Sequence, residues 1–312
     1  MPLHMETDLL LCMIITNKLL KAIYMLNLNV IKERNASKQI PKEVEETRNL
    51  ITESFKNLEF VEDVHKYYLP KGKKKIELPS VSSIIKQWEQ EVDWDEKAEL
   101  KALSLGIPVE DLKRQWHETN IISTSNGSQT HFFGENAMNM FIGREDLTKK
   151  NLPFQFTEDG YLIPYGQKEW AITQYYTDIM NNPDVFPVMP EAKIYTNYNS
   201  TFKMKQPYAG TFDILLAYKL RGEIVYAIHD FKTNKDLYKS YSRDHSVMMK
   251  EPFDTMYEEP YSHYVIQLNC YQLGLMQLGL KIVDRCLIWL KEDGTYEKAR
   301  VPDITETLLP LL

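Results

Sequence analysis

The 312-residue chain contains only three cysteines, and no two of them are close together in sequence. Cys12, Cys270 and Cys286 form no CxxC pair, which argues against a disulfide framework and against a zinc site built on paired thiolates. This sparse use of cysteine predicts an intracellular, reducing compartment rather than a secreted protein.

The chain also lacks a long uninterrupted apolar run. Its most apolar stretch, residues 9–31, is broken by asparagines and lysines, which makes it a poor membrane span. Glu6 and Asp8 precede this stretch, where a secretory signal would carry a basic segment. We therefore expect no membrane association. We interpret this apolar stretch as a helix that is buried or faces a partner, the polar residues 32–57 as weakly helical, and residues 1–57 together as an N-terminal helical appendage.

Positive charge is in short supply: 37 Lys and Arg stand against 44 Asp and Glu, a net charge of −7. Such a chain does not bind phosphate polymers indiscriminately, so any contact with nucleic acid would need local clusters of basic residues. Two such clusters are present: Lys71, Lys73, Lys74 and Lys75, and then Lys232, Lys235, Lys239 and Arg243. Taken alone, each cluster is more typical of a solvated loop than of a binding site.

The most informative stretch is Ala209–Lys235, which is typical of two apolar strands joined by a tight turn. If Arg221 and Gly222 form a two-residue turn, the antiparallel register places Asp213 directly across from Asp230. Their α-carbons would then lie roughly 4.5–5.5 Å apart. Two half-buried carboxylates at that distance destabilise a sheet unless a cation lies between them. The stretch therefore predicts a divalent metal with oxygen ligands, either magnesium or manganese.

The rest of the chain predicts an α/β fold, a mixed sheet flanked by helices. The expected elements, in chain order, are a hairpin of strands 65–69 and 76–78 turning at 70–72, a helix capped by Ser80 or Ser82, helical residues 94–118 broken at 106–108, a small-residue stretch at 123–128, a helix carrying His131 and Glu135, a helix at 170–180, a strand at 191–196, a loop at 236–260, a helix at 261–278, a hairpin at 281–301 and a short final helix.

Several short motifs occur in a characteristic order. They are Gly127-x-x-x-His131, then Glu191, then Gly210-x-x-Asp213, then Asp230-x-Lys232-Thr233, and last Gln267-x-x-x-Tyr271. In this order they resemble the PD-(D/E)XK nuclease superfamily, in particular its RecB-like exonuclease branch. The resemblance covers about residues 60–300 and is closest in style to the viral and mitochondrial exonucleases that process single strands and maintain genomes.

The resemblance implies a metal-dependent deoxyribonuclease, an exonuclease that hydrolyses phosphodiester bonds from single-stranded or duplex DNA ends during replication, recombination or end processing. Residues 58–312 would form the nuclease domain. Lys232 would position the attacking water and stabilise the phosphate in the transition state. The implied ligands of magnesium or manganese are Asp213, Asp230, the Phe231 carbonyl, Glu191 and His131, where the histidine either binds the metal or orients a ligand.

The same resemblance implies contacts with DNA outside the metal site, by Gln267, Tyr271, Thr233, Lys235, Lys239 and Arg243. The chain lacks the four cysteines that hold an iron–sulfur cluster in some relatives, and the proline usual before the first catalytic aspartate is absent. Two alternatives stay open: a structure-specific endonuclease of the same fold, and a catalytically silent DNA-binding scaffold subunit. The two aspartates and the lysine, all retained, favour an enzyme.

Overall fold

A computed structural model describes residues 40–144, 155–158, 162–196, 204–239 and 247–312. The helices of this part of the chain are α3 (Lys42–Phe55), α4 (Val81–Ile85), α5 (Trp94–Leu105), α6 (Val109–Phe141), α7 (Gln167–Asn181), α8 (Pro260–Met276) and α9 (Thr305–Leu308), with 3₁₀ turns at Glu62–Val64 and Leu309–Leu311. The strands are β1 (Glu59–Val61), β2 (Lys66–Lys71), β3 (Lys74–Leu78), β4 (Gln155–Phe156), β5 (Leu162–Ile163), β6 (Val185–Tyr195), β7 (Ala209–Leu220), β8 (Glu223–Lys232), β9 (Ile282–Leu290) and β10 (Tyr296–Arg300).

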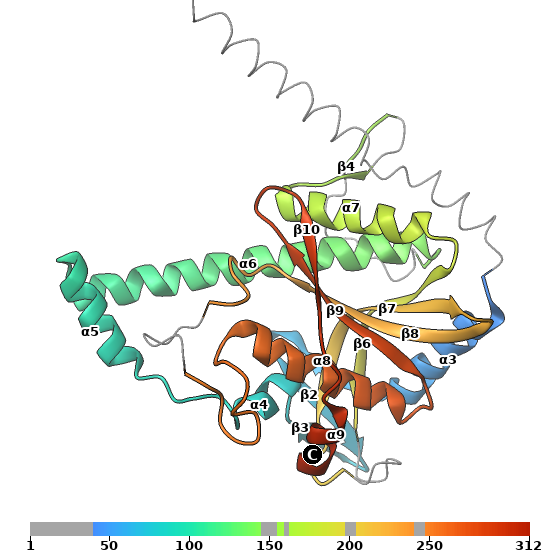
Figure 1. The fold of residues 1–312 in the computed structure, drawn as a ribbon, viewed down its shortest axis with the longest axis horizontal. Coiled ribbons are helices and arrows are strands. Elements are labelled where there is room, and N and C mark those ends of the chain that lie inside the picture. The colour runs from blue at the N-terminus through green and yellow to red at the C-terminus, as the bar shows by residue number, and fades with distance from the viewer. Residues whose placement is uncertain (1–39, 145–154, 159–161, 197–203, 240–246) are drawn as a thin grey trace, which may run out of the picture.

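The centre of the fold is a mixed five-stranded sheet with the strand order β10-β9-β8-β7-β6 (Figure 1). Neighbouring strands are antiparallel except β8 and β9, which run parallel and are joined through α8. A parallel pair needs such a crossover because its two strands start at the same edge of the sheet. The expected mixed α/β class is confirmed.

Helices cover both faces of this sheet. One hydrophobic cluster joins α3, α4, α8 and the C-terminal residues to one face, and a second joins α6 and α7 to the other. The apolar residues of β7 contribute to both clusters, with Leu215 in the first and Leu216 in the second. Successive strand residues point to opposite faces, so a strand buried on both sides is apolar at nearly every position.

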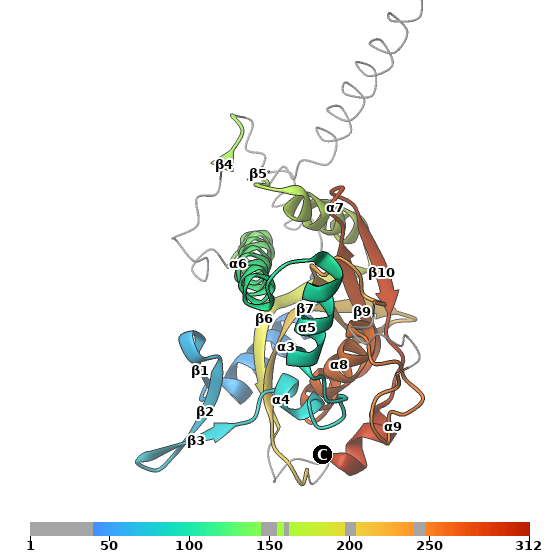
Figure 2. The same ribbon diagram turned by 90° about the vertical axis from the view of Figure 1, so that its left-hand side faces the viewer.

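A second sheet, β1-β2-β3, lies beside the β6 and β7 end of the main sheet (Figure 2). It is attached where the Ala209 N–H donates to the Pro79 carbonyl at 2.9 Å. The hairpin expected here is confirmed, but its turn lies at Gly72, because Pro70 and Lys71 still pair with β3. Ser80 is the N-cap of α4, since its Oγ accepts from the Ser83 N–H at 3.1 Å.

The turn between β7 and β8 has the expected register. Leu220 pairs with Glu223, and both residues between them have positive φ, 51° at Arg221 and 88° at Gly222. Two left-handed residues are the signature of the tight hairpin turn whose twist matches that of the strands. The local pattern was therefore sufficient to fix this pairing.

Strand β6 begins earlier than the expected strand 191–196. Pro187 and Pro190, which precede the expected strand and are residues typical of a connection, lie inside it. The strand tolerates them because β6 is at the edge of the sheet, where a residue without an N–H loses no hydrogen bond to a further strand.

Helix α6 runs without a break from Val109 to Phe141 and carries His131 to the sheet. The small-residue stretch 123–128, expected to lead into the helix of His131, lies inside that helix, and the break at Gly106 is confirmed by its left-handed cap, φ 66°. Small residues disfavour a helix only weakly, and the packing of the buried C-terminal half outweighs that preference. Residues 114–126 are exposed, and this half of α6 projects from the body together with α5 (Figure 1).

Helix α3 lies within the segment 1–57, for which helix was expected. Val44, Ile51 and Phe55 belong to the main hydrophobic cluster, and Thr47 Oγ1 is hydrogen-bonded to Tyr226 OH at 2.6 Å. The helix is thus packed into the same core as the sheet, which the reading of residues 1–57 as an appendage did not anticipate. Residues 1–39 lie outside the described part of the chain.

Within the described residues, no helix is both long enough and apolar enough to cross a membrane. Cys270 and Cys286 are buried free thiols, and Cys12 lies outside these residues.

Candidate metal centre

Three carboxylates lie in one row across β6, β7 and β8. The β6–β7 register pairs the residues on both sides of Glu191 with those on both sides of Asp213, so these two face each other. The β7–β8 ladder runs to the pair Ile214 and His229, and Asp213 and Asp230 are the next residues on the two strands. The predicted register is therefore confirmed up to the last pair before the aspartates.

Asp213 itself is not part of the regular ladder. Its Oδ2 accepts a hydrogen bond from the Phe231 N–H at 2.5 Å. A side-chain oxygen thus binds a donor of the neighbouring strand and fixes the carboxylate against the sheet. Phe231 contributes this N–H to the site, and metal binding by its carbonyl stays a prediction.

Glu191 has a left-handed backbone, with φ 45°, in the middle of a strand. A residue with a β-carbon is strained in this region, by about 1–3 kcal/mol, and such strain clusters at functional sites. Glu191 lies opposite the central carboxylate of the row, so the strained residue is also one of the candidate ligands.

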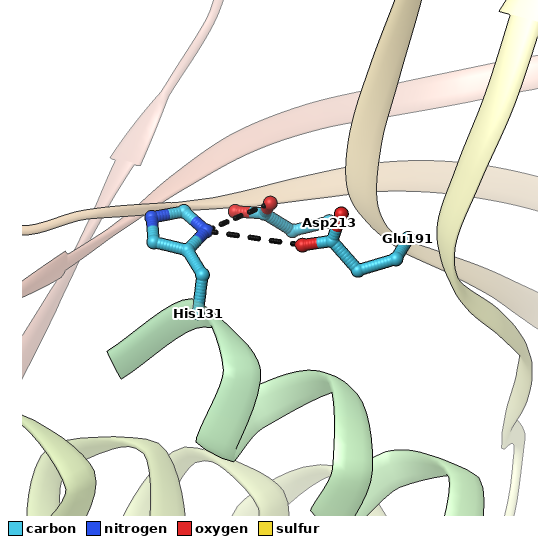
Figure 3. Close-up of side chains that lie close together, drawn as sticks. All are labelled: His131, Glu191 and Asp213. Carbon is cyan, nitrogen blue, oxygen red and sulfur yellow. Dashed lines mark hydrogen bonds and ion pairs between the residues drawn. The ribbon is translucent and has the colours of Figure 1, made fainter. Parts of the chain in front are cut away.

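His131 reaches the row from α6, on the side of the sheet covered by that helix (Figure 3). Its Nδ1 lies 3.0 Å from Asp213 Oδ1 and 4.0 Å from Glu191 Oε1. One ligand atom from each of these three residues lies within 4.8 Å of the other two, close enough for one ion to bind all three. Among the described residues, no other group of three such side chains has its ligand atoms this close together.

The row holds more negative charge than its surroundings readily stabilise. Burial, and then the Asp213 and Glu135 carboxylates, raise the pKa of Glu191 well above its ordinary value. Burial, and then the Asp213 carboxylate, raise the pKa of Asp230 to about 6. Carboxylates with raised pKa values gain the most from a cation, because a positive charge favours their ionised form.

Asp213 is the carboxylate of the row that stays ionised. Burial alone would raise its pKa, but His131, Lys232 and the Phe231 N–H outweigh burial and lower it. In turn, burial disfavours a charged imidazole, yet the Asp213 carboxylate outweighs burial and raises the pKa of His131.

Lys232 is the cation built into the site. It forms an ion pair with Asp230, and its Nζ donates to Gln267 Oε1 at 3.0 Å and lies 4.1 Å from the centre of the Tyr264 ring. Burial opposes its charge, but the Asp230 carboxylate outweighs burial and raises the pKa of Lys232. Asp230 thus binds the lysine and does not join the three-residue group, so its role as a metal ligand stays a prediction.

Gly210 is needed for close packing beneath the row. A β-carbon at this position would lie 2.6 Å from Tyr271 Cε1 and 3.0 Å from Val81 Cγ2. No side chain fits there without displacing the buried tyrosine. The glycine of the Gly210-x-x-Asp213 motif is therefore required by packing against Tyr271, which the sequence alone did not reveal.

These residues open into one cavity of about 240 Å³. Eight residues of the motifs found in the sequence line it, namely His131, Glu191, Gly210, Asp213, Asp230, Lys232, Gln267 and Tyr271. The structure thus brings together motifs that are spread over more than a hundred residues of sequence.

Other predicted DNA contacts lie outside this cavity. The Thr233 carbonyl accepts from Lys168 Nζ at 2.9 Å, and Lys235 and Lys239 are exposed beyond the end of β8. Arg243 lies outside the described residues. The contacts of these four residues with DNA stay predictions.

Sequence reasoning missed one wall of the cavity. This wall consists of Phe60, His65, Tyr67, Ser80, Val81, Ser82 and Thr211. The alternation of residues 65–69 indicated a strand, but nothing in the sequence indicated that this strand lies beside the aspartates.

No protein-family model matches the chain, and no curated protein matches it significantly. The functional argument therefore depends on the geometry of the site and on the chemistry of its residues.

Proposed function

We propose that this protein is a metal-dependent DNA exonuclease with a PD-(D/E)XK core. The observation that carries the proposal is the row formed by Glu191, Asp213 and Asp230, which shares one cavity with His131 and Lys232. Carboxylates on three adjacent strands, next to one largely buried lysine, are suited to a cation and a phosphate at the same time. The motif order that resembles RecB-like nucleases supports the same function.

The donor set fits a divalent metal. Two carboxylates and an imidazole converge within 4.8 Å, and the raised pKa values at the row are those of carboxylates short of positive charge. Carboxylate oxygens suit both magnesium and manganese, whereas an imidazole nitrogen favours manganese, which is a transition metal. When bound, such an ion neutralises a scissile phosphate and lowers the pKa of water.

The residues of the chain supply the rest of the chemistry. Lys232 holds a proton at Nζ, and Asp230 and Gln267 fix that ammonium at the row. There it can bind a phosphate oxygen as negative charge grows in the transition state. Asp213, held by the Phe231 N–H, keeps its ionised form available to the metal.

A digestion assay tests the proposal. End-labelled linear single strands, linear duplexes and closed circles are incubated with magnesium, manganese or EDTA. We expect the wild type to degrade linear DNA but not closed circles, and to do so only when metal is present. The variant Lys232→Met should degrade linear DNA about 100- to 1,000-fold more slowly than the wild type. The matched control is Lys219→Met, which removes an exposed lysine of β7 near the turn into β8, outside the cavity, and should cleave like the wild type.

The other outcomes identify the alternatives. Cleavage of closed circles would indicate an endonuclease of the same fold. Binding of DNA without cleavage under every metal would indicate a scaffold subunit. Circular dichroism spectra of both variants check that lost activity is not lost folding.

A further inference from the structure

Part of the cavity lining is aromatic and has no part in the proposed chemistry. Phe60, His65 and Tyr67, all from the small sheet and its first connection, line the same cavity as Glu191 and Asp213. The Phe60 ring contacts both others, with ring centres 5.0 Å from His65, edge to face, and 4.7 Å from Tyr67. Three packed rings thus line the same cavity as the candidate metal centre.

The position of this wall relative to the row is fixed. Tyr67 is buried, and its hydroxyl is hydrogen-bonded to Thr211 Oγ1 at 3.0 Å. Thr211 lies on β7, two residues before Asp213. Any group bound on the rings is therefore held at a set distance from the carboxylates.

His65 is the exposed member of the wall, and its backbone is left-handed, with φ 52°. Among the described residues, three that are not glycine have positive φ: His65, Glu191 and Arg221. Arg221 belongs to a tight turn and His65 caps the 3₁₀ turn at Glu62–Val64, its N–H donating to the Glu62 carbonyl, whereas Glu191 lies within a strand. His65 and Glu191 both line the cavity, and the turn fixes where the histidine ring leaves the backbone.

The hairpin that carries this wall also carries unpaired positive charge. Lys66 and Lys75 form ion pairs with Glu77 and Glu59. Three further lysines, all exposed near the turn of the hairpin and without an ion pair to any described residue, are Lys71, Lys73 and Lys74. In a chain of net charge −7, this is a local concentration of the charge that phosphates need.

We propose that His65, backed by Phe60, is a stacking subsite for an unpaired nucleobase, and that Lys71, Lys73 and Lys74 bind the phosphates of the same strand. The proposal rests on the proposed function, because the strand reaches the carboxylate row through the cavity. Aromatic rings beside a basic stripe are the usual means of binding single strands. The base must be unpaired, since a ring can stack only on an exposed base face.

The size of the cavity agrees with one nucleotide. Its volume of about 240 Å³ is below the roughly 300–1,000 Å³ of sites for drug-sized ligands, which suits one unpaired base better than a base pair. The exposed Lys193 has its Nζ 5.6 Å from the Phe60 ring centre and adds a further cation at this rim.

The experiment measures binding of the full chain to labelled oligonucleotides by fluorescence anisotropy, in EDTA so that no cleavage occurs. One probe is an oligothymidylate and the other an abasic strand of equal length, which keeps the phosphates and removes the bases. We expect the wild type to bind the thymidylate strand at least fivefold more tightly. His65→Asn, which removes the ring but tolerates a left-handed backbone, should lose this preference.

Two variants at Phe60 separate stacking from packing. Phe60→Leu keeps an apolar side chain without a ring and should also lose the preference, whereas Phe60→Tyr should retain it. Thermal unfolding of each variant checks the fold. Replacement of Lys71, Lys73 and Lys74 by alanine should weaken binding to both strands and reduce the salt slope by about 2.

The outcomes separate this proposal from the proposed function. A base preference without cleavage by the wild type in the digestion assay would support the subsite and contradict the exonuclease. Cleavage with equal affinity for both strands, or a preference unchanged in His65→Asn and Phe60→Leu, would overturn the subsite and leave the exonuclease standing. Absence of binding to either strand in EDTA would overturn the subsite, and the digestion assay with metal would still decide on the exonuclease.

Discussion

Asp213 is the residue on which the site converges. It faces Glu191 on one strand, receives the N–H of Phe231 from the other and contacts His131 of α6. A central strand is the place where one side chain can meet groups from both neighbouring strands and from a helix above the sheet. The low pKa of this carboxyl, beside two with raised pKa values, gives the row unequal affinities for protons.

The first residue-scale prediction concerns competition between protons and metal. Burial, followed by the Asp213 carboxylate, raises the pKa of Asp230 to about 6, and the pKa of Glu191 is raised too. A metal binds the ionised forms, so its affinity should fall as pH falls below 6 and binding at pH 6 should release protons. Calorimetric titration with manganese, in buffers of different ionisation enthalpy, measures both effects.

The matched variant is Glu191→Gln, which should bind manganese at least tenfold more weakly and release fewer protons than the wild type. Affinity that does not change with pH on either side of 6, with no proton release, would contradict this account.

A second prediction at this scale concerns Gly210. In Gly210→Ala the new methyl group would lie 2.6 Å from Tyr271 Cε1, so the buried ring must move. We expect a loss of about 1–3 kcal/mol in the free energy of unfolding, measured with denaturant. Gly127→Ala is the control: its nearest neighbour, Thr233 Oγ1, would lie 3.4 Å away, and alanine favours the helix. Equal stability of both variants would show that the Tyr271 ring is not fixed.

At the scale of elements, α6 is the longest described helix, and its two halves differ in burial. Its C-terminal half is buried on the sheet and holds His131 at the row, whereas residues 114–126 are exposed. The buried half contributes the packing that keeps the histidine in place. A helix of this length has one rigid axis, so the position of the exposed half depends on the buried half.

The element-scale prediction concerns α3. Ile51 is 1% exposed within the main cluster, whereas the adjacent Leu50 is 41% exposed. Ile51→Ala should lower the free energy of unfolding by about 2–5 kcal/mol, because it leaves a cavity in the core. Leu50→Ala should change it by at most about 0.5 kcal/mol. Similar small effects of both substitutions in denaturant titrations would mean that α3 detaches from the sheet without unfolding it.

At the scale of the whole molecule, the sheet separates two cores. Cys270 belongs to the core beneath α8, and Cys286 to the core beneath α6 and α7. Both thiols are buried; burial raises the pKa of Cys286 to about 12 and raises that of Cys270 as well. Neither thiol forms the reactive thiolate while its layer stays packed.

Thiol labelling therefore tests whether the two hydrophobic cores, one on each face of the sheet, unfold together. In the native protein, neither Cys270 nor Cys286 should react with an alkylating reagent, as located by mass spectrometry. In moderate denaturant both should become labelled at the same rate, because the strands between the layers are buried on both sides. Earlier labelling of Cys286 alone would show that α6 and α7 open as a separate unit.

The sequence by itself determined the features that depend on neighbours along the chain. The turn at Arg221 and Gly222 fixes the register of β7 and β8, and alternation along β8 places Asp230 and Lys232 on one face, where they form an ion pair. Helical spacing likewise predicted α7 and α8 within a few residues of their observed bounds. These patterns were sufficient because turn geometry and side-chain periodicity are local properties.

Only the tertiary structure decided which distant segments meet at the site. It placed the aromatic wall of Phe60 and His65 beside the row, packed α3 into the core, and put Glu191 in a left-handed conformation opposite Asp213. Each of these features depends on how apolar faces far apart in sequence are buried together. The hydrophobic effect is non-directional, so an apolar face in the sequence does not indicate which other face it packs against. The residues that form the site could therefore be identified only from the tertiary structure.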